Sequence, residues 1–396
     1  MAILSIAAAF GSKFAETLSF AGDLPEVSAD SVETLLTVMA SSMLAIATFS
    51  VASMVSAYAS ASRSATPRSF TLVVSDDVSQ NALSTFIGSF IFSIVALSAV
   101  TNDFFEQAGL FCLFVITITV FAVVILTFVR WVDRIARLGR LGETVDKVED
   151  ATSAALARRR LAPTFSCNEC DQDDRQGQAL VSKKIAYLQH IDFEQLQCWA
   201  QEHDAKIIIS ALPGTFITPE RPLAYIKSEL NAKELHNDEA LNKAFTLGDD
   251  RVFDDDPRFG LIVLSEIAGK ALSPAINDPG TAIDVIGTLV RLFSQWSNPL
   301  SEEERNEIKF DRIAVPTLSI RDMFDDAFTS LARDGAKTVE LGVRLQKALG
   351  TLATINNGLM GDAATFHANL ALQRAEKALE IKHDFETVRS AGAQEN

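Results

Sequence analysis

Three long apolar runs stand out in the first third of the chain. The first lies between Thr34 and Ser62, the second between Asp77 and Asp103, and the third between Glu106 and Arg130. Each is longer than the roughly 20 residues that a helix needs to cross a bilayer. The pattern therefore predicts three full transmembrane helices and places the chain among membrane proteins.

A shorter apolar segment, MAILSIAAAF, opens the sequence. At about ten residues it is too short to cross a bilayer, and it lacks the basic start and the small-residue cleavage site of a signal peptide. We expect a half-buried interfacial helix there, with the amino terminus at the outer surface.

The distribution of arginines predicts the orientation of the spans. Arginines follow the first and third runs, whereas the short link TNDFFEQ carries only acidic side chains; the arginines are Arg63, Arg68, Arg130, Arg134, Arg137 and Arg140. Because positive charges collect on the cytoplasmic side, the acidic link should face outward. Everything after Arg130 should then be cytoplasmic.

The pattern changes beyond the third apolar run. Residues 131–161 read as a helix that leaves the membrane, and residues 185–191, 206–212 and 216–226 read as strands, the last of them as a hairpin, around a short helix at 192–204. The remainder is mainly helical by its three-four periodicity. The expected helices cover residues 237–247, 257–272, 281–296, 321–335, 338–354 and 366–388, with one strand within 311–320.

These elements predict an α-helical membrane domain joined to a cytoplasmic α+β domain that contains a small β module and a helical bundle. The expected domains are a transmembrane domain over 1–130, a helix leaving the membrane over 131–161, a β-rich module over 162–230 and a mainly helical domain over 231–396.

Composition supports a membrane protein and narrows its partners. The 396 residues are 48% hydrophobic, and the net charge of −16 lies mostly beyond the spans. Nucleic acid is disfavoured as a partner, because a polyanion is bound through a basic face. The isolated Cys167 and Cys170 lack the two further ligands of a structural zinc site, and the five histidines are scattered, so no metal or cofactor is expected.

One stripe of the first span is small and hydroxylated. Ser50, Ser53, Ser56 and Ser60 recur at helical spacing, opposite larger apolar side chains. Such a stripe is typical of close helix packing, and it would equally suit a water-lined path at the axis of a homo-oligomer. No span contains a charged residue, which disfavours a proton-coupled pump and is compatible with a passive pore.

A second candidate site lies at the turn in ALSPAINDPGTAID. Asp278 followed by Pro279 is a typical helix N-cap, so the simplest interpretation is structural. Alternatively, polar residues of this turn could line a pocket for an ion or a small ligand, together with two residues upstream: Arg251, Asp256, Ser273, Asn277, Asp278 and Thr281. No nucleophile, base and orienting group occur together, so we do not expect an enzyme.

Several stretches resemble one bacterial family. The runs LGDDRVFDDDPRFGLIVLSEIAGKALSPAINDPGTA, SSMLAIATFSVASMVSA, SATPRSF and PGTFITPERPLAYI are similar to the predicted membrane proteins grouped as domain of unknown function 2254. The resemblance implies an inner-membrane protein with a cytoplasmic carboxy-terminal domain, and no assigned activity. Members of that family usually have an additional complete span where this chain has only MAILSIAAAF.

Two functions fit these observations. The first is an oligomeric channel or passive transport protein with a cytoplasmic regulatory domain, because the spans are uncharged and one of them carries the serine stripe. The alternative is a membrane-anchored ligand sensor or scaffold, whose spans only anchor and oligomerise it. The expected partners are the lipid bilayer, further copies of the chain and a small ion or ligand.

Overall fold

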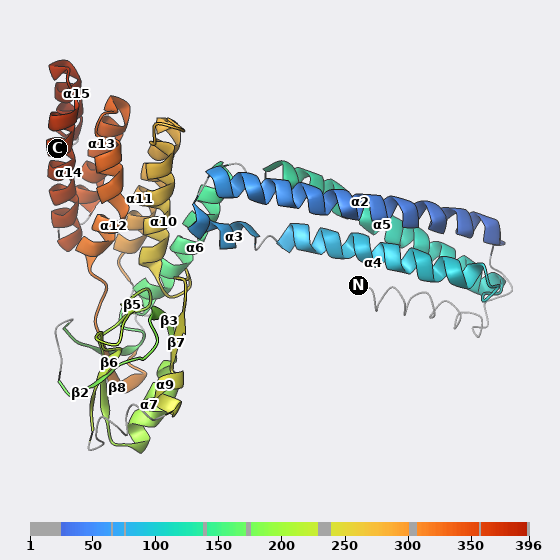
Figure 1. Cartoon of the computed structure of the whole chain (residues 1–396), viewed down its shortest axis with the longest axis horizontal. Helices are drawn as coiled ribbons and strands as arrows, with labels where there is room; N and C mark the ends of the chain where they lie inside the picture. Colours follow the sequence, from blue (N-terminus) through green and yellow to red (C-terminus); the bar gives the residue numbers. More distant parts are fainter. Residues whose placement is uncertain are drawn as a thin grey trace. The chain divides into compact units, whose positions relative to one another are not determined.

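The computed structural model describes residues 25–64, 66–74, 77–137, 141–171, 176–228, 239–300, 307–355 and 358–393. The expected interfacial segment at 1–10 lies outside them. The chain forms two compact units, Met1–Thr144 and Val145–Asn396, each of which is described by itself. Figure 1 shows their elements.

The first unit contains three long helices that are apolar and long enough to span a membrane. The candidate spans are Ala29–Ser60, Asp77–Thr101 and Gln107–Ala136, which confirms the three predicted transmembrane helices. The helices and the short turns between them are α2 (Ala29–Ser64), η3 (Pro67–Ser69), α3 (Phe70–Val74), α4 (Asp77–Val100) and α5 (Gln107–Arg137).

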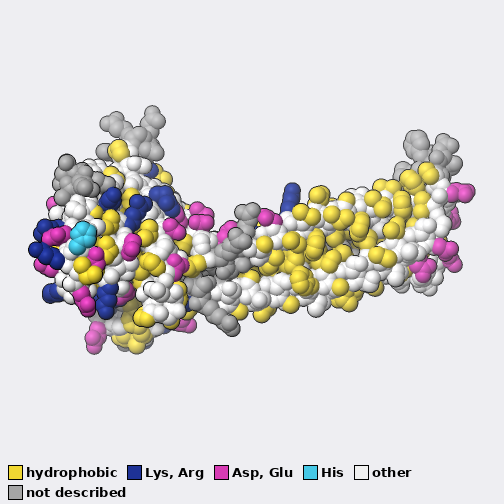
Figure 2. All heavy atoms as spheres, turned by 90° about the horizontal axis from the view of Figure 1, so that it is seen from above, with side chains coloured by type: hydrophobic (Ala, Val, Ile, Leu, Met, Phe, Trp, Pro, Cys, Tyr) yellow, Lys and Arg dark blue, Asp and Glu magenta, His cyan; other side chains and the backbone are white. Residues whose placement is uncertain are grey.

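Large apolar side chains fill the interior of this helical unit. One cluster contains Leu36, Phe92 and Leu113, and a second is built around Phe86 and Trp131. Figure 2 shows hydrophobic side chains over most of the visible outer face of the same helices, while charged side chains crowd the visible face of the second unit. Helices that are apolar both inside and outside are stable in lipid rather than in water.

The second unit is a mixed α+β fold, as the sequence predicts. Helix α6 (Leu141–Leu161) leads into it. Its strands are β1 (Cys167–Glu169), β2 (Gln178–Leu180), β3 (Ala186–Ile191), β4 (Lys206–Ile209), β5 (Phe216–Ile217), β6 (Ala224–Lys227), β7 (Phe245–Gly248) and β8 (Phe310–Val315). Its further helices are α7 (Phe193–Glu202), α9 (Glu239–Lys243), α10 (Pro257–Ala271), α11 (Pro279–Ser297), α12 (Ile320–Asp334), α13 (Val339–Ile355), α14 (Leu359–Ala378) and α15 (Lys382–Ala393).

The strands form two small sheets with the orders β1-β8-β4-β6-β2 and β5-β3-β7. Strands β7 and β8 come from beyond residue 230, so the sheets also draw on the part of the chain that was expected to be mainly helical. The expected hairpin at 216–226 is wrong: β5 pairs with β3 in one sheet, and β6 pairs with β2 and β4 in the other. The segment between β5 and β6 therefore crosses from one sheet to the other.

From α9 onward, the helices follow the predicted pattern with two differences. The expected helix at 237–247 is a short helix, α9, followed by strand β7, which pairs with β3. The single helix expected at 366–388 is two, because α14 ends at Ala378 and α15 begins at Lys382. Both differences bury apolar side chains, since Phe245 joins the core of the sheets and Val388 packs beneath α13.

Candidate functional site

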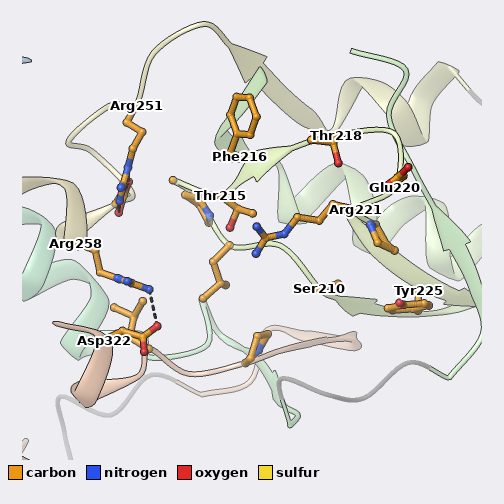
Figure 3. A pocket seen from close by; sticks show the side chains of 17 residues that line it. Ser210, Thr215, Phe216, Thr218, Glu220, Arg221, Tyr225, Arg251, Arg258 and Asp322 are labelled. Atoms are coloured by element: carbon orange, nitrogen blue, oxygen red, sulfur yellow. Dashed lines mark hydrogen bonds and ion pairs between the residues drawn. The ribbon is translucent and has the colours of Figure 1, made fainter. Parts of the chain in front are cut away.

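A polar cavity of about 800 Å³ lies within the second unit, where the two sheets meet the first turns of α10 and α12. Three arginines line it, and we call it the arginine cavity (Figure 3). Its walls come from the segment between β4 and β6, from the loop before α10, and from the link between β8 and α12; they comprise Ser210, Leu212, Pro213, Gly214, Thr215, Phe216, Thr218, Glu220, Arg221, Pro222, Tyr225, Arg251, Asp256, Arg258, Pro316, Leu318 and Asp322.

One wall is built around a buried ion pair. The guanidinium of Arg251 donates from Nε and Nη2 to the two carboxylate oxygens of Asp256, at 2.7 and 2.9 Å. Asp256 is only 2% exposed, and it also caps α10 by accepting from the backbone N–H of Phe259. Burial raises the pKa of Asp256, and the paired Arg251 works in the opposite direction.

Gly214 is required where this wall meets the turn after β4. Its φ of +90° suits glycine, and a Cβ built there would lie 2.0 Å from Oδ2 of Asp256. The backbone of this turn therefore lies too close to the Asp256 carboxylate to leave room for a side chain. A residue with a side chain at position 214 would displace the carboxylate.

A second arginine joins α10 to α12 at the edge of the cavity. Arg258 donates from Nη1 to Asp322 at 2.8 Å and from Nε to Asp326 at 2.6 Å. Burial alone would lower the pKa of Arg258, but the two carboxylates outweigh it and raise that pKa. Arg258 is therefore a fixed, neutralised part of the wall.

The third arginine has a different environment. Arg221 lies in the segment between β5 and β6, and among the described residues its side chain has no ion-pair or hydrogen-bond partner. Figure 3 shows its guanidinium extending toward Thr215 and toward the wall that carries Arg251 and Arg258. Four hydroxyl side chains line the same cavity, those of Ser210, Thr215, Thr218 and Tyr225.

The predicted pocket residues lie in two separate places. Arg251 and Asp256 line the arginine cavity, but the other four lie at the opposite end of α10, which is 15 residues or about 22 Å long. There, Asp278 caps α11 by accepting from the backbone N–H and the hydroxyl of Thr281, at 3.1 and 2.6 Å. These hydrogen bonds lower the pKa of Asp278.

The remaining two residues of that turn also have structural roles. The backbone N–H of Asn277 donates to the carbonyl of Ser273 at 2.8 Å, and Asn277 adopts a φ of 51°, which asparagine tolerates better than most residues. The turn after α10 thus uses Ser273, Asn277, Asp278 and Thr281 to stop one helix and to start the next. The structure does not bring them into one pocket with Arg251 and Asp256.

Comparison with known families agrees with the three apolar spans. The model of the predicted membrane protein family DUF2254 matches residues 1–351. The chain belongs to the DUF2254 family. No curated protein and no solved structure matches the chain. The family is one of unknown function, so the function of this DUF2254 protein has to be argued from its own residues.

The four serines of the stripe on helix α2 of this DUF2254 protein differ in burial. Ser50 is fully buried within the helical unit, Ser53 is half-buried, and Ser56 and Ser60 are exposed. Within the described residues, the Ser50 hydroxyl has no hydrogen-bond partner. Only the carboxy-terminal half of the stripe could therefore face a second copy or lipid.

The cysteine pair of this DUF2254 protein lies at strand β1. Cys167 is buried, Cys170 is half-buried, and burial raises the pKa of the Cys167 thiol to about 12. That thiol therefore stays protonated at neutral pH, whereas the thiolate is the form that binds metals. Across the described ranges, no group of three or more His, Cys, Asp or Glu side chains could hold a metal ion.

The sequence pattern missed the residues that complete the cavity of this DUF2254 protein. Arg221, Thr215 and Tyr225 all fall in the run GTFITPERPLAY, which reads as an ordinary hairpin. A hydroxyl-rich turn that ends in an arginine is a weak signal for a polar site. Arg258 reads as a surface residue of a helix, and only the packing of α10 beside α12 shows its role.

Proposed function

We propose that this DUF2254 protein is a membrane-anchored receptor for a small ligand. The observation that carries the proposal is the arginine cavity, whose wall contains the buried Arg251–Asp256 pair and whose interior offers unpartnered polar groups. A volume of about 800 Å³ lies in the usual range for small-molecule sites. We place the receptor domain in the cytoplasm of a bacterium, because arginines follow the third span.

Helix α6 gives the receptor a route for signalling, since it follows the last span in the chain and its last turn contacts segments that form the cavity wall. Its last turn carries Arg158, Arg159 and Arg160, whose guanidinium groups donate to the carbonyls of Asp254, Pro316 and Asn298, respectively. Asp254 lies in the loop between Arg251 and Asp256, and Pro316 lines the cavity. A ligand that moves either segment would therefore act directly on α6.

Arg159 makes this contact unusually sensitive to its surroundings. It is 4% exposed and stacks on Phe165, with 3.9 Å between its guanidinium carbon and the ring centre. Burial lowers its pKa to about 10, and its Nε and Nη1 atoms have no hydrogen-bond partner within the described residues. Because an incompletely hydrogen-bonded buried charge is costly, a ligand that changes the contacts of Arg159 would change the free energy of this part of the wall.

An oligomeric channel is the second candidate function. The interior of the helical unit is packed with apolar side chains, so a water-filled path would have to form between copies of the chain. The exposed Ser56 and Ser60 on α2 favour this candidate, because they could line such an interface. In the receptor model, the same surface only anchors and oligomerises the protein.

Two measurements on the intact chain separate these functions. The first is thermal unfolding in detergent against a panel of small anions, cations and neutral compounds. The receptor model expects at least one compound to raise the unfolding temperature, and it fails if none of them does. The second is flux of K⁺, Na⁺ and Cl⁻ in liposomes. Flux that disappears in the Ser53→Leu, Ser56→Leu double variant would establish a pore instead of an anchor.

A further inference from the structure

Two of the three arginines that line the arginine cavity are already paired with acidic side chains. Arg251 is satisfied by Asp256, and Arg258 by Asp322 and Asp326, so these two arginines cannot supply a free positive charge. Breaking either pair would leave a carboxylate without its partner, and Asp256 is buried. The two pairs therefore act as rigid walls, and any charge that a ligand meets comes from elsewhere.

Arg221 is the remaining positive charge among the described residues that line the cavity. Among the described residues it has no acidic partner, and it carries the fork of N–H donors that matches the oxygens of a phosphate or a carboxylate. The hydroxyls of Ser210, Thr215 and Tyr225, which line the same cavity, also lack side-chain hydrogen bonds within the described ranges, and Figure 3 shows Thr215 beside the Arg221 guanidinium. Hydroxyls and a guanidinium are the donors that commonly surround a bound oxyanion.

Part of the remaining lining is apolar, and Glu220 adds one carboxylate, which Figure 3 places away from the Arg221 guanidinium. Leu212, Leu318, Phe216 and three prolines face the same space. Inorganic phosphate alone would leave this surface wet, because its few atoms fill only a small part of about 800 Å³. A polyphosphate is also disfavoured, because Arg221 is the one unpaired arginine among the described lining residues and Glu220 adds a negative charge to the same lining.

We propose that the arginine cavity binds a small organic molecule through a single oxyanion group, which the Arg221 guanidinium and the Thr215 hydroxyl hold, while the body of the ligand lies on the apolar part of the lining. This inference rests on the proposed receptor function and names its ligand class. The oxyanion is a phosphate or a carboxylate. Both present oxygens in the geometry that a guanidinium fork recognises.

The test is titration calorimetry of the intact chain in lipid nanodiscs. The probes are phenyl phosphate, benzoate, benzyl alcohol and inorganic phosphate. We expect phenyl phosphate or benzoate to bind more tightly than inorganic phosphate, and benzyl alcohol to bind weakly or not at all. Comparison of phenyl phosphate with benzoate identifies which oxyanion the site prefers. Added salt should weaken binding, because Arg221 is exposed to solvent.

Variants at position 221 assign the binding to the cavity. Arg221→Gln should weaken binding about tenfold or more, because it removes charge-assisted hydrogen bonds. Arg221→Lys keeps the positive charge but loses the fork of N–H donors, so its affinity should lie between those of the wild type and Arg221→Gln. The control is Arg333→Gln, which makes the same change in net charge at an exposed residue outside the cavity lining, and it should bind as the wild type does.

Three results would overturn the inference, and none of them by itself refutes the receptor function. Equal binding of benzyl alcohol and the anions, or equal binding by wild type and Arg221→Gln, would refute the oxyanion site and leave a receptor for another ligand. Binding of neither phenyl phosphate nor benzoate would refute the oxyanion site as well. The receptor function itself fails only if the wider panel of compounds also leaves the unfolding temperature unchanged.

Discussion

Two aspartates of this protein have the same local sequence role and very different surroundings. Asp256 and Asp278 each precede a proline and cap a helix through the backbone N–H three residues later, at 3.2 and 3.1 Å. Asp256 is buried and holds Arg251, whereas Asp278 is half-buried and is held by Thr281. Replacing each by alanine removes the same cap and, at one site only, a buried ion pair.

The magnitudes follow from these contacts. Loss of an N-cap costs about 1 kcal/mol, and loss of one partner from a buried ion pair costs about 3–5 kcal/mol. We therefore expect Asp278→Ala to destabilise α11 by about 1 kcal/mol and Asp256→Ala to destabilise α10 by about 4–6 kcal/mol. Asp256→Asn keeps the cap and should lie between them, which provides a milder variant if the alanine variant does not fold.

Hydrogen exchange of the intact protein measures the free energy of local opening of each helix. Because each 1.4 kcal/mol is a tenfold change, amides of α10 should exchange about a thousandfold or more faster in Asp256→Ala. Amides of α11 should exchange only about fivefold faster in Asp278→Ala. Equal acceleration in the two variants would refute the claim that the Arg251–Asp256 pair stabilises the cavity wall.

Three further predictions concern the second unit. Burial lowers the pKa of His367 in the folded protein, so the unfolded chain takes up this proton at a higher pH than the folded protein does. The stability of the fold should therefore fall as the pH drops below about 6.5. His367→Gln should remove that pH dependence in thermal unfolding. An unchanged pH profile in the variant would contradict this. Glu149 has a lowered pKa because Arg291 donates hydrogen bonds to it, so the stability that Glu149 contributes is present above a pH of about 4.5 and is lost as the pH falls. Glu149→Gln should cost about 1 kcal/mol at neutral pH, a small loss because Arg291 is largely exposed. A variant as stable as the wild type would refute this prediction. Gly214→Ala should lower the free energy of unfolding by about 1–3 kcal/mol, because the new Cβ would collide with Asp256. Chemical denaturation that shows no loss of stability would contradict this prediction.

The spans and most of the helices could be predicted from the sequence because their signals are local. An uncharged run of more than about 20 residues has few alternatives to a membrane helix. Helices α10 to α13 show regular three-four periodicity, and an Asp-Pro pair or a serine cap marks the start of α10, α11 and α12. Each of these signals lies within a few residues of the element that it predicts.

The sheets could not be predicted in the same way, because their pairings are long-range. Strand β8 pairs with β1 and β4, and β7 pairs with β3, across more than 50 residues of sequence. Residues 216–226 read as a hairpin because two strand-like runs flank a turn. Nothing in the run itself shows that each strand finds a better partner in a different sheet.

The candidate site shows the same limit most clearly. Asp256 and Asp278 are both Asp-Pro caps, and the sequence offers no local signal that only the first is buried against an arginine. Arg221 comes from a different segment, and it reaches the cavity only because the chain between β5 and β6 crosses between sheets. A site assembled from separate loops needs the tertiary fold to be seen.

The central claim is that the arginine cavity binds a small ligand. Hydrogen exchange of the intact chain in nanodiscs, with and without the compound of the probe panel that binds most tightly, tests it most directly. We predict protection in the segments that line the cavity, residues 210–222, 251–258 and 316–322, and no change in the spans. Binding that protects other segments, or none of these, would contradict the account.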